Sequence, residues 1–446
     1  MDASARGKIG PRATTIATAI LLIAMATLLA GCFGGGSKER KGALTTSASS
    51  GSAPPNQPAV PAAPPEQSKR KVPAPSNADE VPVADVKGKP IPGQYIVTLK
   101  TDENPRSVAA IAGVSPRWVY EHAVNGFTAQ LNRGQLNALQ HNRAVEAIEP
   151  DQRITTDAAV VEAMDTAGQP WGLDRVDQRS GLSKTYSWWS SGTYGSGYGV
   201  RAYIIDSGIA TGNSDFGGRA VNVYDAFGGT GQDCLGHGTH VAGIVGGYRY
   251  GIAKSVQLRG VRIMDCAGYF LNNSVGSAMA GIDWVRANAV KPAVANMSWH
   301  VGSFSSALND ATTNLINSGV FVSVSANNQS TDSCNDSPSS AVGTVTVAAS
   351  DANDTRASFS DYGPCVDLYA PGVGIRSTYL NGGTNILSGT SMASPHVAGV
   401  AALLKSDYGD QTSATIASWI LTNATTNAIN SNITGTPNRL LFKSNW

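Results

Sequence analysis

Charged residues are scarce in this sequence of 446 residues. Only 15% of them are Asp, Glu, Lys or Arg, and the formal net charge is +1. A chain so close to neutrality has no surplus of one sign with which to attract a nucleic acid or a strongly charged partner. We therefore expect no nucleic-acid partner. The length is sufficient for more than one domain and for a large core.

Long apolar runs are equally rare. The run near the N-terminus, residues 16–30, follows several basic residues and is short for a membrane-spanning helix, which is typical of a signal peptide. It ends in Leu29-Ala30-Gly31-Cys32, which resembles the lipobox of bacterial lipoproteins. The resemblance implies that residues 1–31 are removed and that Cys32 carries a lipid anchor. The alternative is an ordinary secretory signal in which Cys32 has no special role.

Cysteine occurs only five times. If Cys32 carries a lipid, an even number of cysteines remains, and an oxidising compartment would allow two disulfides to form. These residues are Cys234, Cys266, Cys334 and Cys365. At this point the sequence leaves three pairings open, and free buried thiols are the alternative.

Residues 32–88 are rich in Pro, Ala and Ser. A segment of this composition cannot bury enough apolar surface to offset its chain entropy, so we expect an extended, mobile tether.

Residues 89–156 form the first region in which we expect a folded domain. Branched and aromatic residues predict strands near 95–100, 123–129 and 145–151, and helical spacing recurs around 136–140. The inferred order β-α-β-β-α-β predicts a small α+β domain of the ferredoxin-like, split βαβ type.

Residues 164–446 alternate short apolar strands with helical segments, which predicts an α/β domain with a mostly parallel sheet and helices on both faces. The expected strands include residues 200–205, 256–264, 293–297, 320–324 and 344–349.

Three glycine-flanked motifs lie where chemistry is expected, at a strand end or a helix start. They are Ile204-Ile205-Asp206-Ser207-Gly208, Gly236-His237-Gly238-Thr239-His240 and Gly389-Thr390-Ser391-Met392-Ala393. A serine hydroxyl becomes a good nucleophile when an imidazole takes its proton and a carboxylate orients that imidazole. Unpaired N–H groups at a helix start can in addition stabilise an oxyanion. Taken singly, Asp206 would be a turn former and Ser391 a helix cap.

The three motifs together resemble those of the subtilisin-like serine peptidases, and residues 170–446 resemble the proteinase K and aqualysin branch of that family. The resemblance implies a serine endopeptidase that works through an acyl-enzyme, with Asp206 as acid, His237 as base and Ser391 as nucleophile. Residues 89–156 resemble the family's propeptide, which acts as chaperone and inhibitor. Two further histidines are expected to be structural: His240 in the second motif, and His396, which follows the third.

The resemblance also implies a substrate cleft. Asn328 matches the side chain that donates to the oxyanion. The cleft would include Ser298, Trp299, His300, Ser325, Ala326 and Asn327. Asn327 stands where the family usually has Gly, and Trp299-His300 replaces a pattern closer to Leu-Gly, so substrate preference is the least transferable property. A bound peptide would add an antiparallel strand.

The remaining implications concern covalent and metal cross-links. The resemblance selects the disulfides Cys234–Cys266 and Cys334–Cys365 from the three pairings. It also implies a structural Ca²⁺ held by Asp367 and the carbonyls of Val342 and Thr344, an oxygen-only set of the kind that calcium prefers. The alternative is that Asp367 makes an ordinary loop hydrogen bond. No cofactor is expected for catalysis.

The domain order suggests how the protein is regulated. Self-cleavage between residues 155 and 169 would leave the lipid on the propeptide, so a membrane-anchored zymogen would give a releasable, monomeric protease in the periplasm or outside the cell. A surface lipoprotein that keeps the fold as a binding module is the main alternative. An esterase is disfavoured, because the chain lacks a Gly-x-Ser-x-Gly elbow and the Ser-Asp-His order.

Overall fold

The computed structural model describes residues 80–153, 170–188 and 195–444. All of them belong to residues 59–446, the larger of the two compact units of the chain. The predicted signal peptide, Cys32, most of the tether and the expected cleavage segment at residues 155–169 lie outside the described residues. Within the described ranges, no helix combines the length and the apolar character that crossing a membrane requires.

The first folded part contains a four-stranded antiparallel sheet in the order β2-β3-β1-β4. Its elements are β1 (Pro90–Leu99), α1 (Pro105–Ile111), β2 (Trp118–Tyr120), β3 (Gly126–Gln130), α2 (Arg133–Gln140) and β4 (Val145–Gln152). This is the predicted β-α-β-β-α-β order. The helix α2 begins at Arg133, where Asn132 and Gln135 form a reciprocal capping box.

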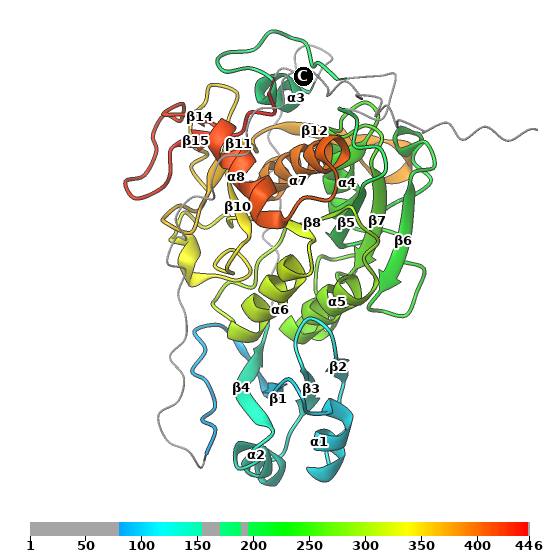
Figure 1. Ribbon diagram of the computed structural model, residues 1–446, viewed down its shortest axis with the longest axis vertical. Coiled ribbons are helices and arrows are strands. Elements are labelled where there is room, and N and C mark those ends of the chain that lie inside the picture. Colours follow the sequence, from blue (N-terminus) through cyan, green and yellow to red (C-terminus); the bar gives the residue numbers. More distant parts are fainter. Residues whose placement is uncertain (1–79, 154–169, 189–194, 445–446) are drawn as a thin grey trace, which may run out of the picture. The chain divides into compact units, whose positions relative to one another are not determined.

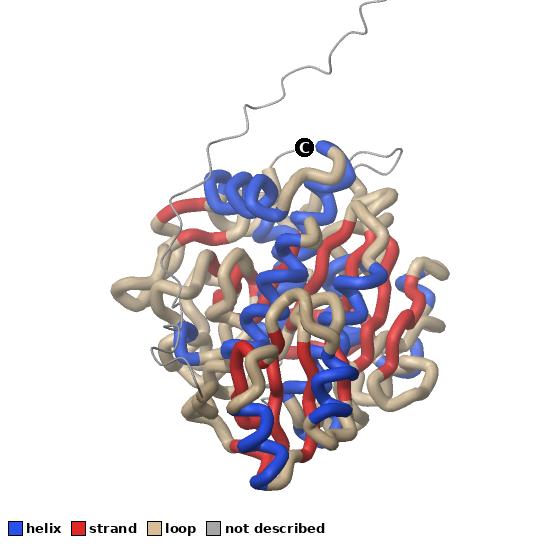
Figure 2. The backbone as a smooth tube through the Cα atoms, turned by 60° about the horizontal axis from the view of Figure 1, so that its bottom comes forward, coloured by secondary structure: helices blue, strands red, loops and turns tan. Residues whose placement is uncertain are grey.

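The two faces of this small sheet pack differently. Val97 and Phe127 point toward α1 and α2 and form a core with them, whereas Ile96 and Tyr120 point the other way and join a core shared with the larger domain. The alternation follows the two-residue period of a strand. The helices α1 and α2 therefore cover the outer face of the small sheet (Figure 2).

The large sheet has nine strands in the order β14-β15-β11-β10-β9-β8-β5-β7-β6, as far as the described residues extend. All neighbouring pairs are parallel except β14 and β15. The strands are β5 (Arg201–Asp206), β6 (Ala220–Asp225), β7 (Gln257–Arg262), β8 (Ala293–Met297), β9 (Phe321–Ser325), β10 (Val345–Ser350), β11 (Leu368–Pro371), β14 (Thr425–Thr426) and β15 (Arg439–Leu440). The predicted mostly parallel sheet is confirmed.

Helices cover both faces of this sheet, as predicted (Figure 1). One face carries α4 (His237–Gly246), α7 (Thr390–Tyr408) and α8 (Ser413–Asn423), and the other carries α5 (Val275–Asn288) and α6 (Ser306–Asn317). Alternate strand residues serve the two cores: Ile204 packs with α4 and α7, and Ile205 with α5 and α6. Smaller elements are α3 (Trp171–Val176), the antiparallel pair β12 (Ile375–Thr378) and β13 (Thr384–Leu387), and 3-10 turns at Ser214–Phe216, Leu271–Asn273, Ser333–Asn335 and Leu380–Gly382.

Two disulfides link loops of the large domain. They join Cys234 to Cys266 and Cys334 to Cys365, so the predicted pairing is confirmed. The linked residues are 32 and 31 positions apart. In the chain-entropy model, closing loops of this size stabilises the folded state by about 3–4 kcal/mol each.

Candidate active site

The carboxyl ends of β5, β8 and β9 meet at one edge of the large sheet, because these strands are parallel. β5 ends at Asp206, β8 leads into Ser298, and β9 leads into Asn328. The helices α4 and α7 bring His237 and Ser391 to the same place. Crevices at this edge of an open α/β sheet are where ligands commonly bind.

Asp206 and His237 form a hydrogen-bonded pair. The Nδ1 atom of His237 lies 2.8 Å from Oδ1 and 3.0 Å from Oδ2 of Asp206. The Asp206 side chain is fully buried, while the imidazole is 18% exposed. The buried carboxylate also accepts the Ser207 N–H at 2.7 Å. The contact between Asp206 and His237 Nδ1 fixes the orientation of the ring. It leaves the other ring nitrogen, Nε2, available to take a proton from another group.

The charge near His237 favours the protonated ring. Burial lowers the pKa of His237, but the negative charge of Asp206, its hydrogen bond and the more distant charge of Asp233 outweigh burial and raise the pKa above 6.5. An imidazole with this environment is suited to hold a proton during a reaction. Asp233 has a further role at this helix, since it accepts the Thr239 N–H at 2.9 Å.

Ser391 is the second residue of α7 and is partly exposed. Its hydroxyl donates to the backbone carbonyl of Ser298 at 3.0 Å, so in this structure it is not hydrogen-bonded to His237. In return, the Ser298 hydroxyl donates to the Ser391 carbonyl at 2.8 Å. Catalytic hydrogen bonds are often absent or long without substrate. Rotation about the Cα–Cβ bond would release the Ser391 hydroxyl.

The side-chain amide of Asn328 lies beside the start of α7. Its Oδ1 atom accepts the N–H of Thr390 at 2.8 Å and the hydroxyl of Thr390 at 2.9 Å. Because the oxygen is held in this way, the Nδ2 group is the part of the amide left to donate elsewhere.

Gly389 keeps a small space open between these donors. A Cβ atom at Gly389 would lie 3.4 Å from Asn328 Nδ2 and 3.6 Å from the Ser391 nitrogen. Both nitrogens therefore border one site, and the Ser391 N–H is in the first helical turn, where no intrahelical acceptor exists. The arrangement offers two convergent donors to an anionic oxygen.

His240 and His396 are buried structural groups. His240 Nε2 lies 3.1 Å from the carbonyls of Ile375 and Asn385, and His396 Nδ1 lies 2.8 Å from the Met392 carbonyl. Burial is the main reason that the pKa of His240 falls to about 3 and that of His396 to about 4. Both rings are neutral at ordinary pH, which leaves His237 as the imidazole of the site.

The predicted cleft residues do not all present side chains to solvent. Trp299 is buried, donates from Nε1 to the Ile205 carbonyl at 2.7 Å and packs edge-on against Phe270. His300 is also buried, with Nδ1 at 3.1 Å from Asp336 Oδ2. Both side chains therefore point into the protein, although the sequence predicts these two residues to belong to the substrate cleft. Contact with a substrate would fall to the backbone of this segment.

The other predicted cleft residues lie at the end of β9. Ser325, Ala326 and Asn327 are buried. Asn327 adopts a φ of 95°, a conformation that favours glycine, which fits the family's usual residue at this position. Its side chain compensates by hydrogen bonding: Nδ2 donates to Asp336 at 2.8 Å, and Oδ1 accepts the Asn328 N–H at 2.5 Å.

The predicted calcium ligands have protein partners as well. Asp367 Oδ2 accepts the Thr346 N–H at 2.8 Å, and the Val342 carbonyl accepts the Thr313 hydroxyl at 3.1 Å. No group of three or more His, Cys, Asp or Glu that could hold a metal occurs among the described residues. Carbonyl oxygens and one carboxylate are chemically suited to calcium, so a site here would depend mainly on the backbone.

Sequence reasoning missed two carboxylates of β4. Glu149 Oε1 accepts the Ser305 hydroxyl at 2.5 Å and its Oε2 accepts the N–H groups of Ser306 and Ala307, at the start of α6. Asp151 Oδ2 accepts the Ser274 hydroxyl at 2.5 Å, at the start of α5. Burial raises the pKa of Glu149 to about 7 and also raises that of Asp151. The sequence of β4 gave no indication of these contacts, because the residues that hydrogen-bond to Glu149 and Asp151 at the helix starts are more than 120 positions away.

Two regions of the chain match known protein families. Residues 197–438 match the subtilase family, and residues 94–157 match the peptidase inhibitor I9 family. The first match spans more than half of the chain and includes Asp206, His237, Asn328 and Ser391. The resemblance inferred from the sequence motifs is thus confirmed.

Characterised relatives give the same result. The extracellular serine proteinase of Thermus sp. (strain Rt41A) is 40% identical over 83% of this chain and 94% of its own length. The cuticle-degrading protease of Metarhizium anisopliae is 37% identical over 86% of this chain and 97% of its own length. Alkaline serine exoprotease A of Vibrio alginolyticus is 40% identical over 77% of this chain, which spans only 63% of that relative.

A solved structure also matches. It is the crystal structure of a cold-adapted subtilisin-like serine proteinase, which is 42% identical. The match has a TM-score of 0.58 and covers 62% of this chain and 99% of that one.

Proposed function

This chain belongs to the subtilase family of serine endopeptidases, and we propose that it hydrolyses peptide bonds of proteins with Asp206, His237 and Ser391 as its catalytic triad. The observation that carries this proposal is the meeting of two features at one sheet edge. One is the buried Asp206–His237 pair, with Nδ1 at 2.8 Å from the carboxylate. The other is the open space at Gly389, bordered by the nitrogens of Asn328 and Ser391.

The reaction begins with the Ser391 hydroxyl. Once it leaves the Ser298 carbonyl, Oγ attacks the scissile carbonyl carbon while His237 Nε2 takes its proton. The carbonyl oxygen becomes an oxyanion, which accepts hydrogen bonds from Asn328 Nδ2 and the Ser391 N–H. Thr390 holds the Asn328 oxygen, so the amide needs no reorganisation at this moment.

Collapse of the tetrahedral intermediate breaks the C–N bond. The protonated His237 gives its proton to the leaving amine, and Asp206 stabilises the imidazolium until then. Water, deprotonated by His237, then attacks the acyl-enzyme ester and releases the acid with Ser391 restored. The raised pKa of His237 supports this role as proton carrier.

The four-stranded domain would act as the inhibitor of its own protease. Its β4 strand contacts the starts of α5 and α6 through buried carboxylates. At the end of β4, the side-chain amide of Gln152 donates to the Phe304 carbonyl at 3.3 Å. The I9 match supports a zymogen that cleaves itself after this domain. We place that cleavage between residues 155 and 169.

Membrane attachment would end with this cleavage. We propose that Cys32 carries a lipid and that the mature, monomeric domain is released into the periplasm or the medium, in agreement with the extracellular proteinase of Thermus sp.. Fractionation of cells that produce the wild type or Ser391→Ala tests this. The variant should remain membrane-bound at full length. A mature wild-type band that stays in the membrane after propeptide degradation would contradict the proposal.

A structural calcium ion would stabilise the loop before β10. Asp367 and the carbonyls of Val342 and Thr344 would hold it, and it would take no part in catalysis. Adding a chelator to the mature protein should lower its Tm, and excess Ca²⁺ should restore it. The same Tm with and without the chelator would contradict a structural Ca²⁺ at this site.

The function itself is tested by incubating the purified precursor with casein. Wild-type protein should process itself and then degrade casein, whereas Ser391→Ala should do neither. A binding module that only keeps the fold would leave both the precursor and the casein intact in either form.

A further inference from the structure

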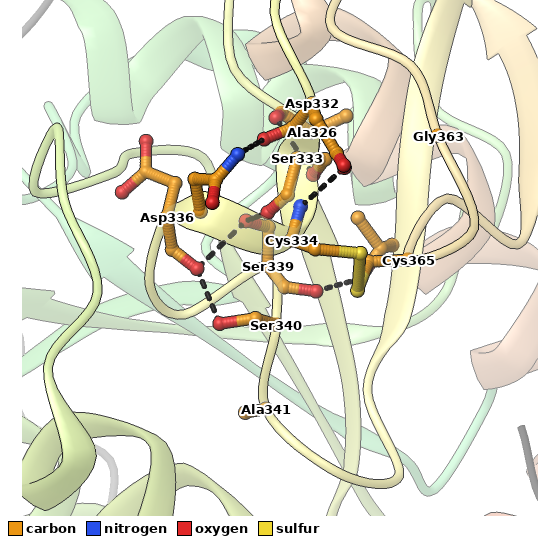
Figure 3. The surroundings of a disulfide bond; sticks show 12 residues. Ala326, Asp332, Ser333, Cys334, Asp336, Ser339, Ser340, Ala341, Gly363 and Cys365 are labelled. Atoms are coloured by element: carbon orange, nitrogen blue, oxygen red, sulfur yellow. Dashed lines mark hydrogen bonds between the residues drawn. A yellow bond between two sulfur atoms is a disulfide. The ribbon is translucent and has the colours of Figure 1, made fainter. Parts of the chain in front are cut away.

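Asp336 is a buried carboxylate that the proposed mechanism does not use. It follows the 3-10 turn Ser333–Asn335, in a loop tied to the chain by the Cys334–Cys365 disulfide. Its backbone carbonyl accepts the hydroxyls of Ser339 and Ser340. Figure 3 shows that its carboxylate points away from this disulfide. The loop therefore fixes the direction of the carboxylate.

The atoms around the Asp336 side-chain oxygens are nitrogens. Oδ1 accepts three backbone N–H groups, from Ser337 at 2.7 Å, Gly302 at 3.0 Å and Val301 at 3.3 Å. Oδ2 accepts the side-chain amide of Asn327 at 2.8 Å, and His300 Nδ1 lies 3.1 Å from it. The side chain is 6% exposed. Such a set of donors stabilises negative charge.

Asp336 joins the two segments that reach the nucleophile. The segment 298–302 touches Ser391 through the Ser298 carbonyl, and the segment 325–328 ends at Asn328, whose amide holds the start of α7. Asp336 contacts residues 300–302 of the first and Asn327 of the second. A substrate carbonyl placed at Ser391 and Asn328 would direct the side chain of the same residue between these segments, toward their junction.

We propose that Asp336 makes the residue on the acyl side of the scissile bond preferentially Lys or Arg and disfavours Asp or Glu there. This inference rests on the proposed function. An ammonium or guanidinium group would form a charge-assisted hydrogen bond with the carboxylate at Oδ2, which accepts one side-chain hydrogen bond, from Asn327. An acidic side chain would face a like charge in a region shielded from water, which is costly.

The test uses self-processed wild-type enzyme and four fluorogenic peptides of the form Ala-Ala-Pro-X-coumarylamide. X is Lys, Nε-acetyl-Lys, Glu or Phe. The Lys peptide should exceed the acetyl-Lys peptide at least about tenfold in kcat/KM, since a hydrogen bond to a charged group contributes that much or more. It should exceed the Glu peptide by about a hundredfold. Equal rates for Lys and acetyl-Lys would overturn the proposal without the need for any variant.

Two variants distinguish the effect of the Asp336 charge from the effect of its hydrogen bond with Asn327. Asp336→Asn should reduce the Lys-to-Glu ratio by about tenfold or more, but its new NH₂ group would face the Asn327 amide. The exchange Asn327→Asp with Asp336→Asn keeps one carboxylate and one amide in contact and should restore the ratio to within about threefold of wild type. The ratio of two substrates is independent of the fraction of active enzyme.

The remaining outcomes are also decisive. A ratio that Asp336→Asn leaves unchanged, or that stays equally low in the exchanged variant, would contradict a role for the charge. Hydrolysis of the Phe peptide reports the proposed function separately. If wild-type enzyme cleaves Phe but shows no preference for Lys, only this inference fails; if it cleaves none of the four, the proposed function fails and takes this inference with it.

Discussion

The helix α7 and the helices α5 and α6 begin in contrasting ways. α7 begins directly after Gly389, which has no side chain and so leaves a space between the Asn328 amide and the Ser391 nitrogen. The starts of α5 and α6 are occupied by Asp151 and Glu149 of the four-stranded domain. All three offer backbone N–H groups and the positive end of a helix dipole.

The comparison shows that the unpaired N–H groups at a helix start can serve two purposes. A permanent carboxylate at a helix start is suited to assembly, since it satisfies donors that would otherwise be buried without partners. An empty start is suited to a reaction, because its donors stay available for a charge that exists only briefly. In the proposed mechanism, the first use holds the inhibitor domain to the protease domain, and the second stabilises the oxyanion.

The largest expected effect comes from removing the nucleophile at the open helix start. Ser391→Ala should lower kcat by about six orders of magnitude and stop self-processing, while the donors at the start of α7 remain. A residual rate of roughly 10³ over water should persist through them. Electrophoresis of the precursor follows self-processing. Peptide hydrolysis measures the residual rate, on variant protein whose propeptide another protease has removed. Normal processing by the variant would show that another residue is the nucleophile.

Removing a donor at the same helix start should have the next largest effect. Asn328→Ala should lower kcat by about 10²–10³-fold with little change in KM, because the oxyanion exists only after attack. Steady-state kinetics on one peptide measures the split. A variant that raises KM alone would indicate that Asn328 binds the substrate in its ground state.

Emptying an occupied helix start should affect the inhibitor and leave the chemistry intact. Glu149→Ala leaves three buried donors at the start of α6 without their partner, at a cost of roughly 1–3 kcal/mol, or about 10–100-fold in affinity. Activity should therefore appear sooner after self-processing of the full-length precursor. Glu103→Ala removes an exposed carboxylate of the same domain, and this control should match wild type. If the delay between self-processing and the appearance of activity is the same in all three proteins, Glu149 does not contribute to the affinity of the inhibitor domain.

A pH dependence of this same contact comes last, because a change of one pH unit alters inhibition by at most roughly tenfold. Burial outweighs the hydrogen bonds of Ser305, Ala307 and Ser306 and raises the pKa of Glu149 from 4.5 to about 7 in the assembled state. Assembly therefore takes up a proton between these values. Inhibition should weaken as the pH rises from about 5 to 7, by at most roughly tenfold per unit, and level off above.

This pH dependence is measured by following the release of activity after processing between pH 5 and 8. Glu149→Gln should flatten the profile, because Gln does not titrate. Inhibition that strengthens with rising pH would mean that the helix start favours the charged carboxylate more than burial opposes it.

Local signals in the sequence were sufficient for much of this picture. Alternating apolar residues and helical spacing predicted both sheets, and glycine-flanked motifs placed Asp206, His237 and Ser391 at strand ends or helix starts. The resemblance to the family added Asn328 and the disulfide pairing. These features depend on short stretches of chain or on patterns shared across a family.

What could not be predicted depends on distant contacts. Trp299 reads as a cleft residue, yet its indole packs under β5 and bonds to Ile205, 94 positions away. The environments of Glu149 and Asp336 could not be predicted from the sequence. Glu149 contacts the start of α6, and Asp336 accepts hydrogen bonds from Val301 and Gly302, more than 30 positions away. The short strand β2 carried too few residues to give a periodic signal.

The most direct test of the central claim is the site of covalent labelling by a fluorophosphonate. Self-processed wild-type protein should carry one adduct, and peptide mass spectrometry should place it on the Ser391 oxygen. His237→Ala should label far more slowly, since its serine has no base. An adduct on any other residue, or an unlabelled Ser391 in correctly processed protein, would contradict the account.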